Sequence, residues 1–351
     1  MSAVRIALAT LVLAVLVGAG RGSDDASLRA PKTAVVGLPF TIAVTVAPPP
    51  KAGSVSVLAT RGALRQSVPV ARSGAAWRAR VLLPSPGRWT LTARVASKPV
   101  ASRTITAVEP AVRHPYAVVV DPRGRVFVAD GAARRIVLIS PVAGGRSVHA
   151  TGFDEPTSLA ATRAALYVAD FNAGLVRRVD ATRRVTTLAR LPQVTAVAVS
   201  PAGVVHAVTM PGRLVRISVS GRVTTIPVAG GLDRPHGVAV ERDGRLLVAE
   251  DSRRVRRVDP ATGRAELVVD GVDTNKIAVA RDGTLFLAGS TLTGGSLRRL
   301  EPGGKPTILL DDLHISDVAV LPDGDLVTTA IEPGAVFRVD ARTGARRKLA
   351  G

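Results

Sequence analysis

Short runs of alternating apolar and polar residues fill the segment from Thr33 to Val108. Six phrases carry this alternation: FTIAVTVA, GSVSVLAT, ALRQSVPVA, AAWRARVLL, RWTLTARVA and SRTITAV. Turn-forming runs such as PPPKAG, RSG and PSPG separate them. Because successive side chains of a strand point to opposite faces, this pattern predicts a small antiparallel sandwich without helices. Trp77 and Trp89 are its predicted core anchors.

From His114 onward the alternation returns as a repeated phrase. Its six versions are HPYAVVVDPRGRVFVAD, EPTSLAATRAALYVAD, QVTAVAVSPAGVVHAVT, RPHGVAVERDGRLLVAE, DTNKIAVARDGTLFLAG and HISDVAVLPDGDLVTTA. They begin at residues 114, 155, 193, 234, 273 and 314, at spacings of 41, 38, 41, 39 and 41. Each leads into a third and a fourth short strand. Four strands in about forty residues are typical of propeller blades. The sequence therefore predicts an all-β chain, with a sandwich at 33–108 and a six-bladed β-propeller at 112–351.

Two features inside the repeat have predicted structural roles. Glycine recurs in the turn between the first and second strands, where a left-handed backbone is cheap only for glycine. These glycines are Gly124, Gly203, Gly244, Gly283 and Gly324, whereas the second repeat has Ala164 and a different predicted turn. An acid closes the second strand in three repeats, at Asp130, Asp170 and Glu250. We expect these acids to accept backbone hydrogen bonds in the turn that follows.

The first residues separate from the rest. MSAVR carries one arginine, and the fifteen residues IALATLVLAVLVGAG carry no charge. This pattern predicts a signal peptide at 1–20, followed by a polar spacer at 21–32. The apolar run is shorter than the roughly 20 residues of a bilayer span, although an uncleaved N-terminal anchor is the alternative. Either way, we expect a secreted, cell-surface or periplasmic protein.

Charge and cysteine content narrow the partners. The absence of cysteine excludes disulfides, thiol nucleophiles and cysteine metal sites. The net charge is +20, and the segment from Ala26 to Val108 has 12 Lys or Arg but no Asp or Glu. One interpretation is adhesion of this segment to anionic cell-wall polymers. The other is an arginine-rich composition without function. The segment contains no recognisable nucleic-acid-binding module, so its basic charge is weak evidence for nucleic-acid binding.

The phrases GVAVERDGRLLVAE and YAVVVDPRGRVFVADGAARRIVLI resemble the NHL family of six-bladed propellers over residues 112–351. Relatives of that family include the calcium-dependent lactonases of the gluconolactonase group (SMP-30-like) and the streptogramin lyases. The phrase GAAWRARVLLPSPGRWTLTARV is similar to the Ig-like modules of exported bacterial proteins, which implies a spacer. One such propeller scaffold hosts hydrolases, lyases and pure binders, so the resemblance implies a fold more firmly than an activity.

In these relatives the site lies at the channel mouth, where the innermost strands begin. The residue two positions before the first recurring aliphatic of each repeat forms a column, which we predict to bind the ligand: Tyr116, Thr157, Thr195, His236, Asn275 and Ser316. The lactonases place calcium-binding carboxylates and an asparagine in this column, and only Asn275 matches. RPHGVAV resembles a phrase of the streptogramin lyases, which makes His236 a candidate catalytic base. Those lyases, however, have seven blades and need a further histidine and glutamate near a magnesium ion.

Two functions follow. The first is an exported monomeric binding protein that requires no cofactor and whose propeller recognises a small molecule or a protein. The polar, uncharged column suits a neutral ligand. The second is a metal-assisted lyase or lactone hydrolase, with His236 as the base and Ca²⁺ or Mg²⁺ held at the mouth by the neighbouring acids Glu155, Asp273 and Asp317.

Overall fold

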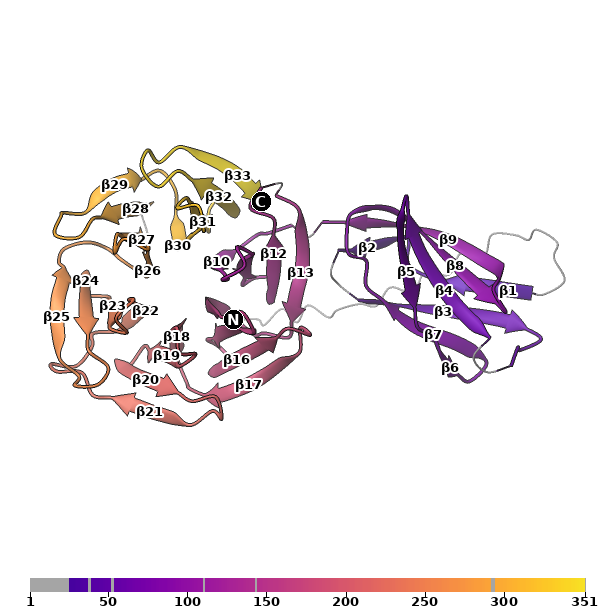
Figure 1. Cartoon of the computed structure of the whole chain (residues 1–351), viewed down its shortest axis with the longest axis horizontal. Helices are drawn as coiled ribbons and strands as arrows, with labels where there is room; N and C mark the ends of the chain where they lie inside the picture. The colour runs from indigo at the N-terminus through magenta and orange to yellow at the C-terminus, as the bar shows by residue number, and fades with distance from the viewer. Residues whose placement is uncertain are drawn as a thin grey trace, which may run out of the picture. The chain divides into compact units, whose positions relative to one another are not determined.

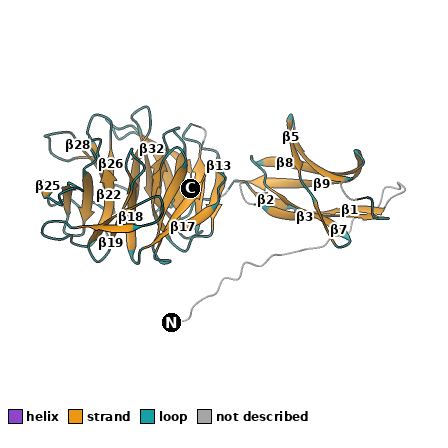
Figure 2. Cartoon of the chain, turned by 60° about the horizontal axis from the view of Figure 1, so that its bottom comes forward, coloured by secondary structure: helices purple, strands orange, loops and turns teal. Residues whose placement is uncertain are grey.

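The computed structural model describes residues 25–36, 39–51, 54–109, 111–142, 144–291 and 294–350. These residues form strands joined by turns and loops (Figure 2). They contain no helix long and apolar enough to cross a membrane. The chain divides into Met1–Glu109 and Pro110–Gly351, which we call the sandwich unit and the ring unit. The predicted signal peptide lies outside the described residues.

The sandwich unit consists of two sheets with strand orders β1-β3-β7-β6 and β2-β9-β8-β4-β5. The strands of the first are β1 (Asp25–Arg29), β3 (Phe40–Ala47), β7 (Ala76–Val81) and β6 (Ala71–Ser73). Those of the second are β2 (Thr33–Val35), β9 (Lys98–Val108), β8 (Gly87–Val95), β4 (Val55–Arg61) and β5 (Leu64–Val68). All neighbours pair antiparallel except β2 and β9, which are parallel.

Alternation builds the core of this unit. In β7 the residues Trp77, Ala79 and Val81 are buried, whereas Arg78 and Arg80 between them are exposed. The inward residues of both sheets join in one apolar cluster. Trp89 is 1% exposed and its indole N–H donates to the carbonyl of Ser85 at 2.9 Å. Both tryptophans are therefore core residues, as predicted.

One strand lies where the sequence pattern predicts a spacer. Asp25–Arg29 forms β1, which pairs antiparallel with β3 at the edge of the first sheet. Leu28 is buried in the core, and Ala26 packs against it. The alternation in ASLRA is too short to separate from a polar linker, and pairing with β3 decides the outcome. The spacer at 21–32 is thus corrected for these residues.

The ring unit contains, among its described residues, six four-stranded sheets, each built from consecutive strands. The first three sheets comprise β10 (Pro115–Val120), β11 (Val126–Asp130), β12 (Arg135–Ile139), β13 (Arg146–Thr151); β14 (Pro156–Ala161), β15 (Ala165–Asp170), β16 (Leu175–Asp180), β17 (Val185–Arg190); and β18 (Val194–Val199), β19 (Val205–Thr209), β20 (Arg213–Ile217), β21 (Val223–Ile226). The other three comprise β22 (Pro235–Val240), β23 (Leu246–Glu250), β24 (Arg254–Val258), β25 (Ala265–Val269); β26 (Lys276–Val279), β27 (Leu285–Thr291), β28 (Gly294–Leu300), β29 (Thr307–Leu310); and β30 (Ile315–Val320), β31 (Leu326–Ala330), β32 (Ala335–Val339), β33 (Arg346–Ala350).

The sheets close into a ring (Figure 1). The innermost strand of each sheet contacts that of the next, and β30 of the last sheet contacts β10 of the first. Six apolar clusters fill the spaces between successive sheets, including the space between the last and the first. A four-stranded sheet is apolar on both faces here, so each needs a neighbour on either side and the ring must close.

The turns after the innermost strands follow the predicted pattern. The five recurring glycines have φ between 76° and 95°, in the left-handed region. In the second sheet, Thr162 replaces this arrangement: its hydroxyl accepts hydrogen bonds from the N–H groups of Ala164 and Ala165. This turn is different, as expected from Ala164.

The acids that close the second strands are buried and structural, but their partners differ from the prediction. Asp170 Oδ1 accepts the N–H groups of Asp154 and Glu155, both at 2.8 Å, from the segment that precedes the innermost strand. Asp130 and Glu250 do the same with upstream N–H groups of their own repeats. The turn that follows uses backbone bonds instead, such as Gly174 N–H to Phe171 O. The acid therefore fastens the incoming chain.

Each of these acids also meets an arginine of the third strand. The pairs are Arg135 with Asp130 at 3.0 Å, Arg177 with Asp170 at 3.5 Å and Arg256 with Glu250 at 2.7 Å. The same guanidinium groups donate to carbonyls of the segment between sheets, as Arg177 does to Gly152 at 3.1 Å. We call each set an acid–arginine clamp. In the Asp130 and Glu250 clamps this arrangement satisfies buried polar groups that no strand pairing reaches, whereas Asp170 Oδ2 and Arg177 Nε form an ion pair without a hydrogen bond.

Candidate functional site

A bulge sets the direction of the predicted ligand-binding column. In five sheets the pairing of the innermost strand shifts between its first and third residues, for example between Pro235 and Gly237. The bulged residues are Tyr116, Thr157, Thr195, His236 and Ser316. A bulge re-aims a side chain relative to the regular pleat. Five of the six column residues therefore occupy the same structural position in their sheets.

Three column hydroxyls hold the ring together. Thr195 Oγ1 donates to the carbonyl of Pro235 in the next sheet at 2.7 Å. Ser316 Oγ donates to the carbonyl of Pro115 at 2.6 Å, which joins the last sheet to the first. Thr157 Oγ1 lies 3.4 Å from the carbonyl of Thr195 in the next sheet and 3.4 Å from that of Ala169 in its own sheet. Because these hydroxyl protons are used between sheets, these three residues are poorly placed to recognise a ligand.

His236 remains half-buried, with 30% of its side chain exposed. Its Nε2 lies 3.3 Å from Asp251 Oδ1, and Asp251 is also paired with Arg234. Burial lowers the pKa of His236 below its usual value, and the Asp251 carboxylate opposes this shift. A neutral ring that donates from Nε2 to Asp251 keeps Nδ1 as an acceptor. His236 can thus accept a hydrogen bond or a proton.

Tyr116 and Asn275 complete the column. Burial, with the Glu155 carboxylate as a second cause, raises the pKa of Tyr116 above its usual value. The ring of Tyr116 lies where a Cβ on Gly131 would be, 2.2 Å from two ring carbons, so glycine is required beneath it. The N–H of Asn275 donates to the carbonyl of Ala288 at 2.8 Å. Tyr116 is therefore a neutral phenol at pH 7.

Two charged residues lie one position further along the innermost strands: Lys276, which the sequence analysis missed, and Asp317, which it assigned to a metal site. The residues at this second position are Ala117, Ser158, Ala196, Gly237, Lys276 and Asp317. Lys276 Nζ donates to the carbonyls of His236 at 3.0 Å and Thr195 at 3.3 Å, so it spans three successive sheets. The other positions have small residues. This contrast in residue size and charge is the signal in the sequence that could have identified Lys276.

Asp317, in the last sheet, also links neighbouring sheets of the ring. Its Oδ2 accepts the N–H of Val118 in the first sheet at 3.0 Å, and Oδ1 accepts that of Val318 at 2.8 Å. Burial raises the pKa of Asp317 to about 6, opposed by the charge of Lys276. Burial likewise lowers the pKa of Lys276, opposed by Asp317. Mutually perturbed groups of this kind occur at functional sites, and also in structural networks.

The three acids predicted to hold a metal go to separate places. Asp273 pairs with Arg253 at 3.2 Å, Asp317 binds backbone N–H groups, and Glu155 lies near Tyr116. The described part of the chain contains no group of three or more His, Asp or Glu side chains arranged to hold a metal ion. Calcium prefers six to eight oxygen ligands. The residues present at the mouth therefore do not fit Ca²⁺ or Mg²⁺ as the sequence analysis arranged them.

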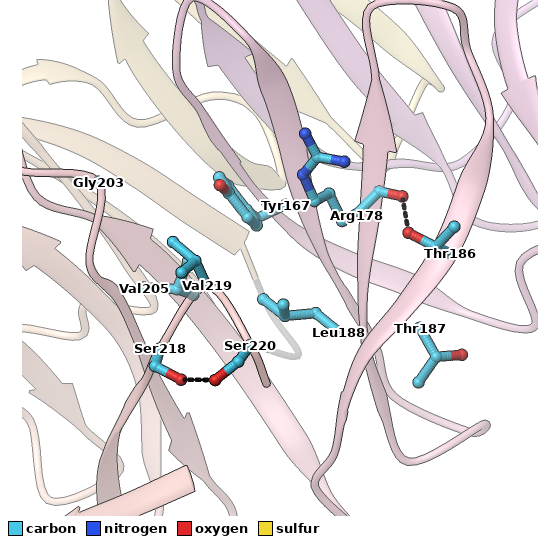
Figure 3. Close-up of a pocket in the computed structure, with 10 residues that line it drawn as sticks. All are labelled: Tyr167, Arg178, Thr186, Thr187, Leu188, Gly203, Val205, Ser218, Val219 and Ser220. Atoms are coloured by element: carbon cyan, nitrogen blue, oxygen red, sulfur yellow. Dashed lines mark hydrogen bonds between the residues drawn. The ribbon is translucent and has the colours of Figure 1, made fainter. Parts of the chain in front are cut away.

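A separate pocket of about 410 Å³ lies between the second and third sheets (Figure 3). It is lined by Tyr167, Arg178, Thr186, Thr187, Leu188, Gly203, Val205, Ser218, Val219 and Ser220. Gly203 belongs to the turn at the far end of β18, whereas the column begins at its near end. This pocket is therefore at the opposite end of the sheets from His236.

The chain was compared with known proteins. No family model and no curated protein matches it. A putative gluconolactonase structure is 16% identical, with a TM-score of 0.52, over 69% of this chain and 92% of that chain. The WD40 β-propeller domain of Doa1 is 14% identical, with a TM-score of 0.50, over 64% and 92%. The ring unit is a β-propeller.

A third similar structure extends further along the chain. It is a structural genomics protein of unknown function from Bacteroides thetaiotaomicron, 14% identical with a TM-score of 0.55, over 89% of this chain and 96% of that chain. Identities this low establish the propeller fold and leave the activity open. The predicted all-β class and propeller are confirmed.

Proposed function

We propose that the chain is an exported binding protein whose propeller recognises a neutral small molecule or a protein at the end where its innermost strands begin. The observation that carries this proposal is the set of groups left at that end. Tyr116 and His236 are partly exposed and neutral at pH 7, while the nearby acids are held by arginines or by backbone. The acids so held are Asp251, Asp273 and Asp317, whereas Glu155 lies beside Tyr116. The neutral groups of Tyr116 and His236 can form hydrogen bonds to a ligand without a metal.

The finer assignments belong to the same proposal. Six four-stranded sheets with glycine-bearing turns support an NHL-type propeller of six blades. Two packed sheets support an Ig-like spacer ahead of it. Export depends on residues 1–20, and N-terminal sequencing of the secreted protein would identify cleavage near Gly20.

The binding end is tested by thermal shift with a panel of neutral saccharides, lactones and peptides. We expect a saturable rise in melting temperature for at least one class, lost in His236→Ala and reduced in Tyr116→Phe. His206→Ala is the matched control, because His206 lies in β19 opposite Ala198, toward the other end of β18 from the column residue Thr195. A stabilisation that survives both column substitutions would place the binding elsewhere.

The alternative is the metal-assisted lyase or lactone hydrolase with His236 as base. It is favoured only by the position of His236 and its accepting Nδ1. Millimolar Ca²⁺ or Mg²⁺ should leave the melting temperature of the full chain unchanged. A saturable rise that disappears in Asp273→Asn would reverse the ranking, because a ligand of the folded state alone stabilises it by mass action.

A second candidate role concerns the sandwich unit. Arg29, Arg78 and Arg80 are exposed on the outer face of the first sheet, where Ala43 pairs with both Arg29 and Arg78. This unpaired basic face supports adhesion to anionic cell-wall polymers. Retention on immobilised polyphosphate should fall steeply between 50 mM and 500 mM salt, and further in the triple Arg→Gln variant. Retention that is independent of salt would exclude an electrostatic contact.

A further inference from the structure

The third strands of five propeller sheets carry an arginine at one equivalent position. Each of these arginines pairs in register with a residue of the second strand: Arg178 with Tyr167, Arg216 with His206, Arg257 with Leu247, Arg299 with Phe286 and Arg338 with Val327. The repeated structure therefore provides its own controls. The sheets can be compared for what neutralises this charge.

In the fourth, fifth and sixth sheets, carboxylates neutralise it. Arg257 bonds Glu241 at 2.6 Å and Glu266 at 2.9 Å. Arg338 bonds Asp323 and Asp325 at 2.6 and 2.7 Å, and Arg299 bonds Glu301 at 2.6 Å. Guanidinium groups and carboxylates form short, charge-assisted bonds of this kind.

In the second sheet, threonines occupy the two positions at which the fourth sheet has Glu241 and Glu266. Glu241 follows the last residue of β22, and Thr162 follows the last residue of β14. Glu266 pairs in register with Arg257, and Thr186 pairs with Arg178. Among the described residues, no hydrogen bond or ion pair is made by the Arg178 guanidinium. The pKa of Asp180 is lowered first by hydrogen bonds from Thr182 and Arg184 in its own turn, and also by the Arg178 charge. Asp180 is partly exposed.

The opposite wall of the pocket also has a serine where three other sheets have an aspartate. The third-strand turns begin with Asp180, Asp259 and Asp340 in three sheets, each closed by a bond from its own N–H to the residue that ends the turn. In the third sheet this residue is Ser218, whose hydroxyl bonds that of Ser220 at 2.9 Å. Figure 3 shows these two serines on one side of the pocket, with Tyr167 and Arg178 on the other.

The serine turn is held tightly against the second sheet. Gly221 has a φ of 85°, and a Cβ there would lie 2.2 Å from the carbonyl oxygen of Leu188, a lining residue. The wall of the pocket that carries the two serines therefore has a fixed position. The pocket volume of about 410 Å³ is that of a small-molecule site.

We propose that this pocket is a second binding site, for a small hydroxylated oxyanion such as a sugar phosphate or a sugar acid. The Arg178 guanidinium takes the phosphate or carboxylate group, in place of the carboxylates that the other sheets supply. Tyr167, Ser218 and Ser220, which carry hydroxyl groups, line the space for the remainder of the ligand. A planar guanidinium suits two-point contact with either kind of oxyanion.

The test is calorimetric titration of the full chain at low ionic strength with glucose 6-phosphate, glucuronate and neutral glucose. We expect one or both anions to bind and glucose not to bind, and the stronger anion identifies the acid group. Arg178→Gln should weaken binding at least about tenfold. Arg216→Gln is the matched control: it makes the same charge change at the equivalent position of the next sheet, on an exposed residue outside the pocket.

A second variant restores the acid. Thr162→Glu places a carboxylate where the fourth sheet has Glu241, and it should abolish anion binding while the far-ultraviolet circular dichroism stays unchanged. Equal weakening by Arg178→Gln and Arg216→Gln, or the absence of binding by both anions, would overturn the proposal. His236→Ala should bind these anions normally, which separates this site from the one at the other end of the propeller.

Discussion

The two units of the chain solve the same problem in different ways. The sandwich unit relies on alternation alone: one apolar cluster lies between two sheets, and the segment from Ala26 to Val108 has no carboxylate with which to form a salt bridge. The propeller has six smaller clusters and fastens the chain that enters each sheet with bonded polar groups, including three acid–arginine clamps. Each repeat of the propeller has an irregular segment that leads into its innermost strand. Backbone N–H and C=O groups of that segment that have no strand partner need other hydrogen bonds.

The sequence allows the two units to be followed separately. Both tryptophans, Trp77 and Trp89, lie in the sandwich unit, and both tyrosines, Tyr116 and Tyr167, lie in the propeller. Tryptophan fluorescence therefore reports unfolding of the first unit, and second-derivative tyrosine absorbance reports that of the second. Two transitions are expected, so a single free energy of unfolding does not describe the chain.

The largest effect should come from breaking a clamp. Glu250→Ala leaves the N–H of Asp233 and the guanidinium of Arg256 without their carboxylate, at a cost on the order of 3–5 kcal/mol. The tyrosine transition in urea should shift and the tryptophan transition should stay. Glu266→Ala is the control, because this exposed acid lies in the same sheet. Equal shifts for the two variants would contradict a special role for the clamp.

A core truncation should give the reverse result. Leu91 is 0% exposed in the sandwich, and Leu91→Ala should cost about 2–5 kcal/mol through lost burial and a cavity. It retains both tryptophans, so fluorescence can follow the transition directly. If the tyrosine transition moves by the same amount, the two units unfold together and the comparison fails.

The next largest difference should be in how the stability of the two units depends on pH. From Ala26 to Val108 there is no Asp, Glu, His, Cys or Tyr, so the tryptophan transition should be flat between pH 5 and 8. In the propeller, burial raises the pKa of Asp317 from 3.8 to about 6. The folded state then binds more protons, so this contribution to stability is present below pH 3.8 and is lost as the pH rises through 6.

The variant Asp317→Asn isolates that contribution. The free energy of unfolding of the natural protein, minus that of the variant, should be larger at pH 4 than at pH 7, by on the order of 2 kcal/mol. Urea titrations of both proteins at the two pH values measure it. A difference that grows with pH would mean that the Lys276 charge, rather than burial, dominates the pKa of Asp317.

The smallest effect should come from a surface pair. Arg346 and Asp312 lie 2.5 Å apart, but their side chains are 32% and 55% exposed. Asp312→Asn should cost less than about 1 kcal/mol, because solvent screens the pair. A cost similar to that of Glu250→Ala would show that burial does not set the strength of these pairs.

Local chemistry explains how much of the fold was predictable. The alternation and the glycines act within a few residues, so the strands, the buried tryptophans and the turn positions followed from the sequence. The strand at Asp25–Arg29 did not, because its pairing with β3 is a tertiary event. The partners of Asp170 were also missed, since Asp154 and Glu155 come next to it only after the sheet folds.

The candidate site was predictable in position and less so in role. The column was found because the repeats align, yet the hydroxyls of Thr195 and Ser316 are used between sheets. Their use depends on carbonyls brought by neighbouring repeats, which no single repeat reveals. Lys276 stood out only against the small residues at equivalent positions. The pocket beside Arg178 required the comparison of whole sheets, because its signal is a missing acid.

The way in which the ring closes determines where the chain can be cut and rejoined. Every described sheet of the propeller is built from consecutive strands, and the last and first of these sheets meet through apolar packing and side-chain bonds such as Ser316 to Pro115. No strand is shared across that seam. A circular permutation that joins β33 to β10 and opens the chain between any other two sheets would leave each sheet whole. Insertion or loss of an entire repeat would likewise alter the ring without splitting a sheet.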